Sequence, residues 1–263
     1  MSASIRLGIV GGAGWLGGAI AGAALTAGVV RADTLALSYR RAKPDRFAGA
    51  FWTHDNQALA DRCDVIMLSV RPQDWPPLAI DARGKLVISV MAGIRLAEIG
   101  ARHGTHRVVR TLPNAAAEVE RSYTPWITSS GANDEDRAVV RAIFDACGTQ
   151  DEVASERDID YLTGLTGSGP AFPALLADAM MRDAVRFGLS PQVARRAVNT
   201  VLTGTGRLLE LNDASPAETV EAFLGYRGTT AAAIETMRQA GFDDAVAKGL
   251  TAAFEKSIAM GQG

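Results

Sequence analysis

The stretch that decides the fold opens the chain and reads Ile5-Arg6-Leu7-Gly8-Ile9-Val10-Gly11-Gly12-Ala13-Gly14-Trp15-Leu16-Gly17. It begins as a short β-type run, and the small residues that continue to about Ala27 predict a helix. The glycines between have G-x-G-x-x-G spacing: the first permits a tight turn, the second lets backbone approach a pyrophosphate, and the third allows close helix–strand packing. A glycine turn selected only for packing is the alternative. Because this turn joins a strand to a helix, we favour a dinucleotide site formed by Gly12, Ala13, Gly14, Trp15, Leu16 and Gly17.

The residues after the second apolar run bear on which dinucleotide binds. Residues 34–38 form a strand-like run, and Tyr39-Arg40-Arg41 follows where an NAD site would carry an acid for the ribose hydroxyls. Arginine forks instead match the oxygens of a 2′-phosphate. Arg40 and Arg41 therefore favour NADPH, with NADH as the alternative cofactor. Two solvated arginines at a strand end are the other interpretation.

Continuous apolar runs mark the rest of the first half. Residues 64–70 and 85–90 lack the alternation of a half-exposed strand, which is typical of strands covered on both faces of a parallel sheet. Similar signals stand at 108–111, 126–129 and 152–153, and after about Ala154 only helices are indicated. The sequence predicts an α/β protein: an N-terminal Rossmann-type parallel-sheet domain over residues 1–155 and a C-terminal all-helical dimerisation domain over residues 156–263.

The helices of the second half have wide apolar faces. Residues 171–189 are apolar nearly all round, apart from a stripe at Asp178, Arg182, Asp183 and Arg186. A helix with so narrow a polar face must be deeply buried or lie against a partner chain. Ser190-Pro191 and Ser215-Pro216 predict further helix starts, and Gly241 predicts a helix end. Since a second copy buries such faces readily, we expect a homodimer or a higher homo-oligomer.

Composition excludes several classes of protein. The chain has 263 residues, 48% of them hydrophobic, and a net charge of −2, which disfavours disorder and leaves no electrostatic footprint for nucleic acid or an acidic membrane surface. Its apolar stretches are too short for a membrane span. Cys63 and Cys147 are the only cysteines and no secretory signal precedes them, so we expect a cytoplasmic protein without disulfides.

Metal and nucleophile signals are weak. His103-x-x-His106 lacks the spacing of a helical metal pair, so no metal site is expected. Ser168 is not in a G-x-S-x-G elbow. None of the lysines lies in the glycine-rich start of the second half, where a catalytic base or acid would be sought.

Two glycine-rich segments of the helical half call for a functional account. Residues 163–172 are unusually small for the approach to a buried helix. Residues 225–231, Gly-Tyr-Arg-Gly-Thr-Thr-Ala, place a flexible loop and two hydroxyls at a helix N-terminus. Unpaired N–H groups there, together with the hydroxyls, would make a site for a small carboxylate. Ordinary capping by Thr229 or Thr230 is the alternative.

The chain resembles the Δ1-pyrroline-5-carboxylate reductase family, and the resemblance runs essentially end to end. The residues that carry it are the turn at 12–17, Ser69-Val70-Arg71-Pro72-Gln73, Ser89-Val90-Met91-Ala92-Gly93, Val109-Arg110-Thr111-Leu112-Pro113-Asn114, Gly167-Ser168-Gly169-Pro170-Ala171-Phe172 and Gly228-Thr229-Thr230. The resemblance implies NADPH-dependent reduction of a cyclic imino acid, 1-pyrroline-5-carboxylate to L-proline, which is the last step of proline biosynthesis. It also implies a dimer in which the helical domains interleave, with the active site between a cofactor domain and helices of the dimer.

The resemblance further assigns roles to residues. Val70, Arg71 and Pro72 would line the ribose region of the cofactor, and Ala92, Gly93 and Asn114 would lie near the nicotinamide. Backbone N–H groups at Gly228, Thr229 and Thr230 would hold the substrate carboxylate, and Thr230 would hydrogen-bond the ring nitrogen.

The chain also departs from the family pattern. Where the family has Ser-Pro-Gly-Gly-Thr-Thr, this loop reads Gly225-Tyr226-Arg227-Gly228-Thr229-Thr230, so an arginine replaces one of the paired glycines. Trp15-Leu16 replaces Asn-Met, Ala115 replaces a common threonine, and Gly11 looks like an extra residue. Our hypothesis is that Arg227 pairs with an additional acidic group, or otherwise changes which cyclic imine fits. The alternatives are a reductase of a different cyclic imine or carbonyl acid, and a catalytically silent NADPH-binding dimer.

Overall fold

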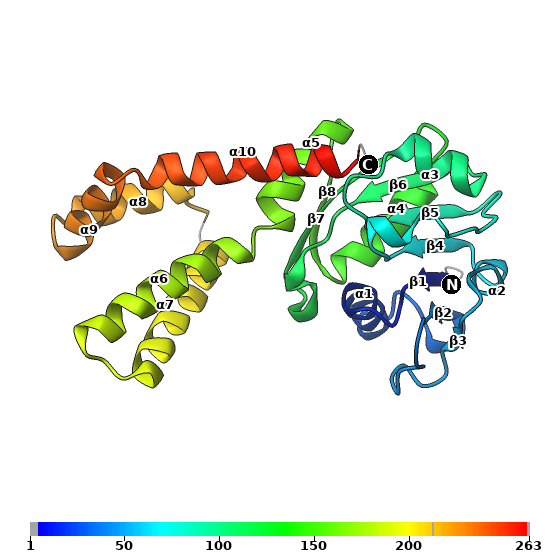
Figure 1. Ribbon diagram of the computed structural model, residues 1–263, viewed down its shortest axis with the longest axis horizontal. Helices are drawn as coiled ribbons and strands as arrows, with labels where there is room; N and C mark the ends of the chain where they lie inside the picture. Colours follow the sequence, from blue (N-terminus) through cyan, green and yellow to red (C-terminus); the bar gives the residue numbers. More distant parts are fainter. Residues whose placement is uncertain (1–4, 212, 262–263) are drawn as a thin grey trace. The chain divides into compact units, whose positions relative to one another are not determined.

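The computed structural model describes residues 5–211 and 213–261, which divide into two compact units (Figure 1). The first unit contains the chain up to Ser168 together with the chain from Ala252 onward, and the second contains residues 169–251. The division into domains at residues 155 and 156 stays a prediction. A helix, α5 (Glu156–Leu162), begins at that point and still belongs to the first compact unit.

An eight-stranded sheet forms the centre of the first unit, in the order β3-β2-β1-β4-β5-β6-β7-β8. Neighbouring strands are parallel except for β6 and β7, which are antiparallel. The strands are β1 (Leu7–Val10), β2 (Leu35–Ser38), β3 (Phe51–Thr53), β4 (Val65–Leu68), β5 (Leu86–Ser89), β6 (Val108–Thr111), β7 (Ser122–Thr128) and β8 (Gly148–Glu152). The predicted parallel-sheet architecture is confirmed, and β3 is a strand that the sequence patterns did not indicate.

Helices cover both faces of this sheet, which explains why its central strands are apolar throughout. Helices α1 (Trp15–Thr26) and α4 (Asp134–Asp145) contribute to one core with alternate residues of the strands, such as Leu7 and Ile9 of β1. Helices α2 (Asn56–Asp61) and α3 (Leu96–His103) contribute to the opposite core, which takes Val10 from the same strand. Side chains on both sides of the central strands β1, β4 and β5 are thus removed from water.

The second unit is entirely helical. It comprises α6 (Ala171–Phe187), α7 (Pro191–Leu211), α8 (Pro216–Gly225), α9 (Thr229–Gln239) and α10 (Phe242–Met260), which enters the first unit at Ala252. The predicted start of α8 is confirmed, because Ser215 Oγ accepts from Glu218 N at 3.2 Å and Glu218 Oε2 accepts from Ser215 N at 2.7 Å.

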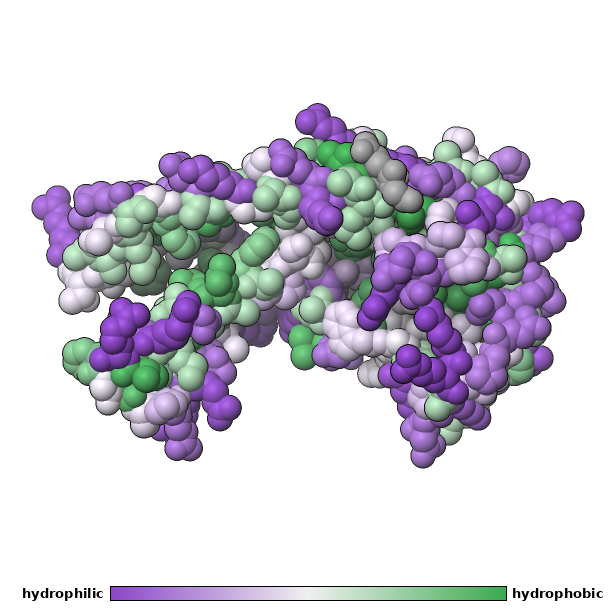
Figure 2. Space-filling model, in the orientation of Figure 1, coloured by the Kyte–Doolittle hydropathy of each residue, from purple (hydrophilic) through white to green (hydrophobic). Residues whose placement is uncertain are grey.

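This helical unit has almost no core within one chain. Among its described residues, the only buried apolar side chains are Ala194, Val198 and Ala231. Large apolar side chains are instead exposed along its helices, as the hydrophobic colouring in Figure 2 shows, and they include Leu175, Phe187, Val201, Leu208, Phe223 and Met237. Since burial of apolar surface is what stabilises a domain, these helices need a partner to cover them.

Candidate active site

The turn between β1 and α1 is shaped by glycines that no other residue can replace without movement. Gly11 has φ +81°, and a Cβ there would collide with the carbonyl oxygen of Ser69. A Cβ on Gly12 would lie 3.0 Å from Cβ of Leu37, and one on Gly17 would lie 2.9 Å from the carbonyl oxygen of Gly11. Gly11 is therefore not a spare residue: it supplies the left-handed conformation of the tight turn that we expected from Gly12.

Hydrogen bonds within the turn decide which N–H groups remain for a ligand. Gly11 N donates to Ser38 Oγ at 2.9 Å, and the N–H groups of Gly12, Ala13 and Gly14 donate to backbone carbonyls at 2.8–3.1 Å. No side chain caps α1 at Gly14. The first N–H groups of a helix have no acceptor within it, so those free to bind an anion belong to Trp15, Leu16 and Gly17. The predicted residues thus divide into those that shape the turn and those that offer donors.

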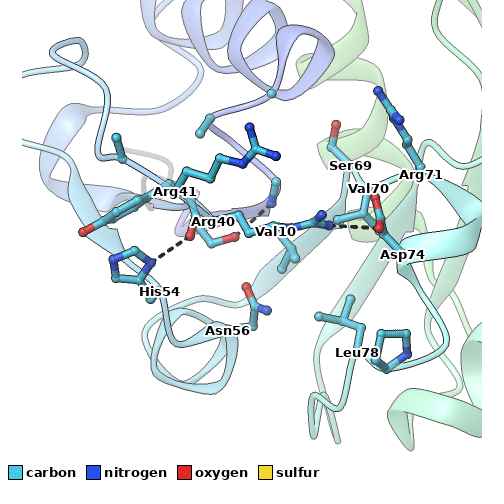
Figure 3. Close-up of a pocket in the computed structure, with 17 residues that line it drawn as sticks. Val10, Arg40, Arg41, His54, Asn56, Ser69, Val70, Arg71, Asp74 and Leu78 are labelled. Atoms are coloured by element: carbon cyan, nitrogen blue, oxygen red, sulfur yellow. Dashed lines mark hydrogen bonds and ion pairs between the residues drawn. The ribbon is translucent and has the colours of Figure 1, made fainter.

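A cavity of about 850 Å³ opens beside this turn, at the carboxyl ends of β1, β2 and β4 (Figure 3). The strand order reverses here, because β1 pairs with both β2 and β4, and open α/β sheets bind ligands at such a point. Six predicted cofactor residues line the cavity: Ala13, Gly14, Arg40, Arg41, Val70 and Arg71. The glycine cradle, the free N–H groups and these arginines together fit a phosphate-bearing dinucleotide.

The arginines of this cavity differ in their partners. Arg40 reaches to Asp74, with Nη2 and Oδ1 3.1 Å apart (Figure 3). Arg41 and Arg71 have no ion-pair partner within residues 5–211 and 213–261. Three arginines therefore line the cavity, whereas Asp74 is the one carboxylate among the described residues that line it, and this excess of positive charge favours an anionic ligand.

Sequence reasoning missed several residues that line the same cavity. Tyr39 and His54 pack ring against ring, with centroids 3.9 Å apart, and His54 Nδ1 lies 3.2 Å from the Tyr39 carbonyl oxygen. The other polar lining residues that were not predicted are Ser38, Asn56, Ser69 and Asp74. Tyr39 and Ser38 adjoin the predicted arginines and could have been included on that ground. His54 and Asn56 follow β3, the strand that the sequence did not reveal.

Eight predicted cofactor residues are not among those that line this cavity: Gly12, Trp15, Leu16, Gly17, Pro72, Ala92, Gly93 and Asn114. Both ends of the Asn114 side-chain amide are hydrogen-bonded: Oδ1 accepts from Ala116 N at 2.9 Å and Nδ2 donates to the Thr166 carbonyl oxygen at 3.0 Å. Thr166 belongs to a π-helical turn, Thr163–Gly167, of the kind often found at functional sites. Asn114 thus fixes this turn through its side-chain amide.

The predicted substrate loop lies in the second unit, between α8 and α9. Gly228 is the residue before α9 and no side chain caps that helix, so the expected alternative, capping by Thr229 or Thr230, is not observed. The hydroxyls of both threonines and the first N–H groups of α9 are therefore available to a ligand. Arg227 precedes them with φ +47°, a left-handed conformation that favours glycine.

Comparison with known proteins identifies the family. A pyrroline-5-carboxylate reductase from Synechocystis is 32% identical over 212 residues, covering 79% of each chain, and one from Methanosarcina acetivorans is 30% identical over 98% of each chain. The chain belongs to the pyrroline-5-carboxylate reductase family. The family model described as pyrroline-5-carboxylate reductase dimerisation matches residues 156–260, and the model described as NADP oxidoreductase coenzyme F420-dependent matches residues 6–93.

A solved member of the family shares the fold. The Plasmodium falciparum pyrroline carboxylate reductase, whose crystal structure has NADP bound, aligns over 98% of each chain with a TM-score of 0.83 and 26% identity. The predicted combination of a Rossmann-type sheet and a helical dimerisation region is thus confirmed. Position 227, where the family pattern has glycine, keeps the glycine-like conformation although it carries arginine.

Other chemistries find little support in the described part of the chain. Burial raises the pKa of Cys63 to about 11 and that of Cys147 to about 12, so neither thiol is activated as a nucleophile. Within residues 5–211 and 213–261 there is no cluster of three metal-binding side chains, and no helix is long and apolar enough to cross a membrane.

Proposed function

We propose that this chain uses NADPH to reduce a cyclic imino acid, most directly 1-pyrroline-5-carboxylate to L-proline. The observation that carries the proposal is that a chain of this family contains two sites. One is a phosphate-binding turn with free N–H groups at residues 15–17, and the other is an uncapped, hydroxyl-bearing helix start at residues 228–230. The first suits the cofactor and the second suits the substrate carboxylate.

The chemistry requires little of the protein beyond positioning. When bound, the dinucleotide supplies a hydride to the imine carbon, and the electron pair of the C=N π bond moves to nitrogen, which keeps its proton. An imine is basic enough to be partly protonated near neutral pH, so no strong protein acid is needed. In our proposal the N–H groups of residues 228–230 hold the carboxylate, and the Thr230 hydroxyl holds the ring nitrogen. Orientation of this kind supplies much of a rate enhancement.

Asp74 gives a test of cofactor preference. In the proposed site Arg40 and Arg41 bind the 2′-phosphate, so Asp74 competes with that phosphate for Arg40. An exposed ion pair is worth at most about 1 kcal/mol, so Asp74→Asn is expected to lower the Kd for NADPH about two- to fivefold. The Kd for NADH, which lacks the 2′-phosphate, should stay unchanged. Calorimetric titration of both dinucleotides checks this, and equal changes for the two would show that Arg40 does not read the 2′-phosphate.

A second copy of this chain is the partner that we propose for the helical unit. Its exposed apolar side chains require a cover, and the matched family region is a dimerisation region. We propose a homodimer as the minimal assembly. Cys63 and Cys147 are free and buried, which supports a reducing compartment such as the cytoplasm.

The activity itself is tested by following NADPH absorbance with 1-pyrroline-5-carboxylate and with a panel of other cyclic imines. Oxidation of NADPH with formation of proline supports the proposal. Tight NADPH binding without turnover of any imine would instead favour a silent, cofactor-binding dimer. Faster turnover of another imine would favour a reductase with a different substrate.

Arg227 is the departure from the family pattern that supports a different imine as the substrate. Arg227→Gly, measured on the same panel of imines, tests this alternative. Glycine matches the left-handed backbone, so the loop should keep its conformation and only the guanidinium is lost. If Arg227 pairs with an additional acidic group, kcat/KM for imines that bear a second carboxylate should fall about tenfold or more, as for a lost charged hydrogen bond. Monocarboxylate imines should be little affected. An unchanged kcat/KM across the panel would exclude this role.

A further inference from the structure

Arg46 hydrogen-bonds the backbone of the phosphate-binding turn. Its Nη2 donates to the Gly12 carbonyl oxygen at 2.9 Å and to the Gly14 carbonyl oxygen at 3.3 Å. Arg46 does not line the cofactor cavity; it lines a separate cavity along α1, which also contains Trp15 and Gly18. The guanidinium therefore binds two carbonyls of the turn without occupying the cofactor cavity.

The surface of α1 is adapted to receive this arginine. Gly18 and Gly22 are four residues apart and so lie on one face of the helix. A Cβ on Gly18 would collide with the Arg46 guanidinium, whereas a Cβ on Gly22 would make only an ordinary contact of 3.7 Å with Phe47. Phe47 lies against Trp52 of β3 with nearly parallel rings and has φ +56°, an uncommon conformation for a bulky residue. The loop thus holds Arg46 in place at the cost of backbone strain.

Electrostatics connect this contact to the cofactor. A cation near a helix N-terminus is unfavourable, because the helix dipole is positive there. Arg46 nevertheless adds a positive charge beside the start of α1, whose first N–H groups are unpaired. A bound pyrophosphate would make this arrangement favourable, because the positive charge of Arg46 and the positive end of the α1 dipole would then both lie near an anion.

On the basis of the proposed function, we propose that Arg46 is a positioning residue for the dinucleotide. Its guanidinium holds the turn in the conformation that binds the pyrophosphate. It lies in the same β2–β3 connection as Arg41, in which we place the 2′-phosphate contact. The β2–β3 loop thereby acts on both phosphate-bearing parts of NADPH. Arg41 would contact the 2′-phosphate directly, and Arg46 would stabilise the turn that binds the pyrophosphate.

The test compares Arg46→Met and Gly18→Ala, with Gly22→Ala as the matched control on the same helix face. Gly18→Ala displaces the guanidinium without removing its charge, and alanine favours the helix at both positions. Calorimetry without imine gives the Kd for NADPH and NADH, steady-state kinetics give KM and kcat, and thermal unfolding checks folding. Arg41→Met serves as the reference for a contact to the 2′-phosphate alone.

We expect Arg46→Met and Gly18→Ala to raise the Kd for NADPH and for NADH by the same factor, about tenfold, with kcat at saturating NADPH within about twofold of wild type. Arg41→Met should weaken NADPH only, and Gly22→Ala should change neither. Unchanged Kd values in Arg46→Met or in Gly18→Ala would overturn the inference, as would an equal effect of Gly22→Ala. If the unmodified chain bound neither dinucleotide, the proposed function would fail as well. If the unmodified chain turned over normally and the variants had unchanged Kd values for both dinucleotides, only the role of Arg46 would be overturned.

Discussion

Thr230→Ala is expected to lower kcat for 1-pyrroline-5-carboxylate reduction about a hundredfold, as for the loss of one well-placed donor to the reacting centre. Thr230 lies in the first turn of α9, and no capping hydrogen bond occupies its hydroxyl. In the proposed site this hydroxyl holds the ring nitrogen while hydride adds to the neighbouring carbon. The phosphate-binding turn belongs to the other compact unit, so the Kd for NADPH should stay within about twofold.

Two neighbouring variants control this experiment. Thr230→Ser keeps the hydroxyl and should retain most of the activity. Thr229→Ala removes the adjacent hydroxyl from the same turn and should have a much smaller effect on kcat, because its proposed contribution is through backbone N–H. Normal turnover of Thr230→Ala at saturating substrate, combined with weakened NADPH binding, would contradict the assignment.

The first unit was largely predictable because its sequence signals are local. Strands covered on both faces are apolar throughout, and a strand that ends in a glycine turn before a helix has few alternatives. Strand β3, Phe51–Thr53, escaped notice because it is three residues long and only half-buried. The glycine spacing was wrong on one detail: it assigned the tight turn to Gly12, whereas Gly11 has the left-handed backbone and has no room for a Cβ beside the Ser69 carbonyl.

The candidate site was predictable only where its residues are neighbours in sequence. Arg40 and Arg41 directly follow a strand, so their place at the sheet edge could be inferred. Asp74 contacts Arg40, and Arg46 contacts the turn, across distances in sequence that no local pattern reveals. The role of Asn114 near the nicotinamide stays a prediction, and its position in a motif did not show that both ends of its amide are hydrogen-bonded within the chain.

The helical unit shows a different limit. Its helices and their caps follow from local residues, and those predictions are confirmed for α8 by the Ser215 capping box. Their packing does not follow, because one chain buries so few of their apolar side chains. The missing information lies in the surface of the partner that covers them.

The largest effect on stability is expected from Arg110→Met, in the first unit. Arg110 of β6 is 0% exposed and forms ion pairs with Asp160, itself 2% exposed, at 2.6 Å and with Glu156 at 3.2 Å. Arg95 also reaches Asp160, at 2.9 Å, but is itself 37% exposed. Removing Arg110 leaves the buried Asp160 carboxylate paired with the partly exposed Arg95, so its charge is incompletely compensated, and we expect the free energy of unfolding to fall by about 3 kcal/mol.

Urea unfolding of all variants at the same chain concentration measures this loss, because the contribution of chain concentration to stability is then the same for each. Arg31→Met is the control, since Arg31 and Asp33 form an exposed pair that should contribute less than about 1 kcal/mol. Adding Asp160→Asn to Arg110→Met should recover part of the stability, because it removes the charge that was left buried. If Arg110→Met cost no more than Arg31→Met, or if the second substitution lowered stability further, the ion pairs around Arg110 would not be what joins α5 to the sheet.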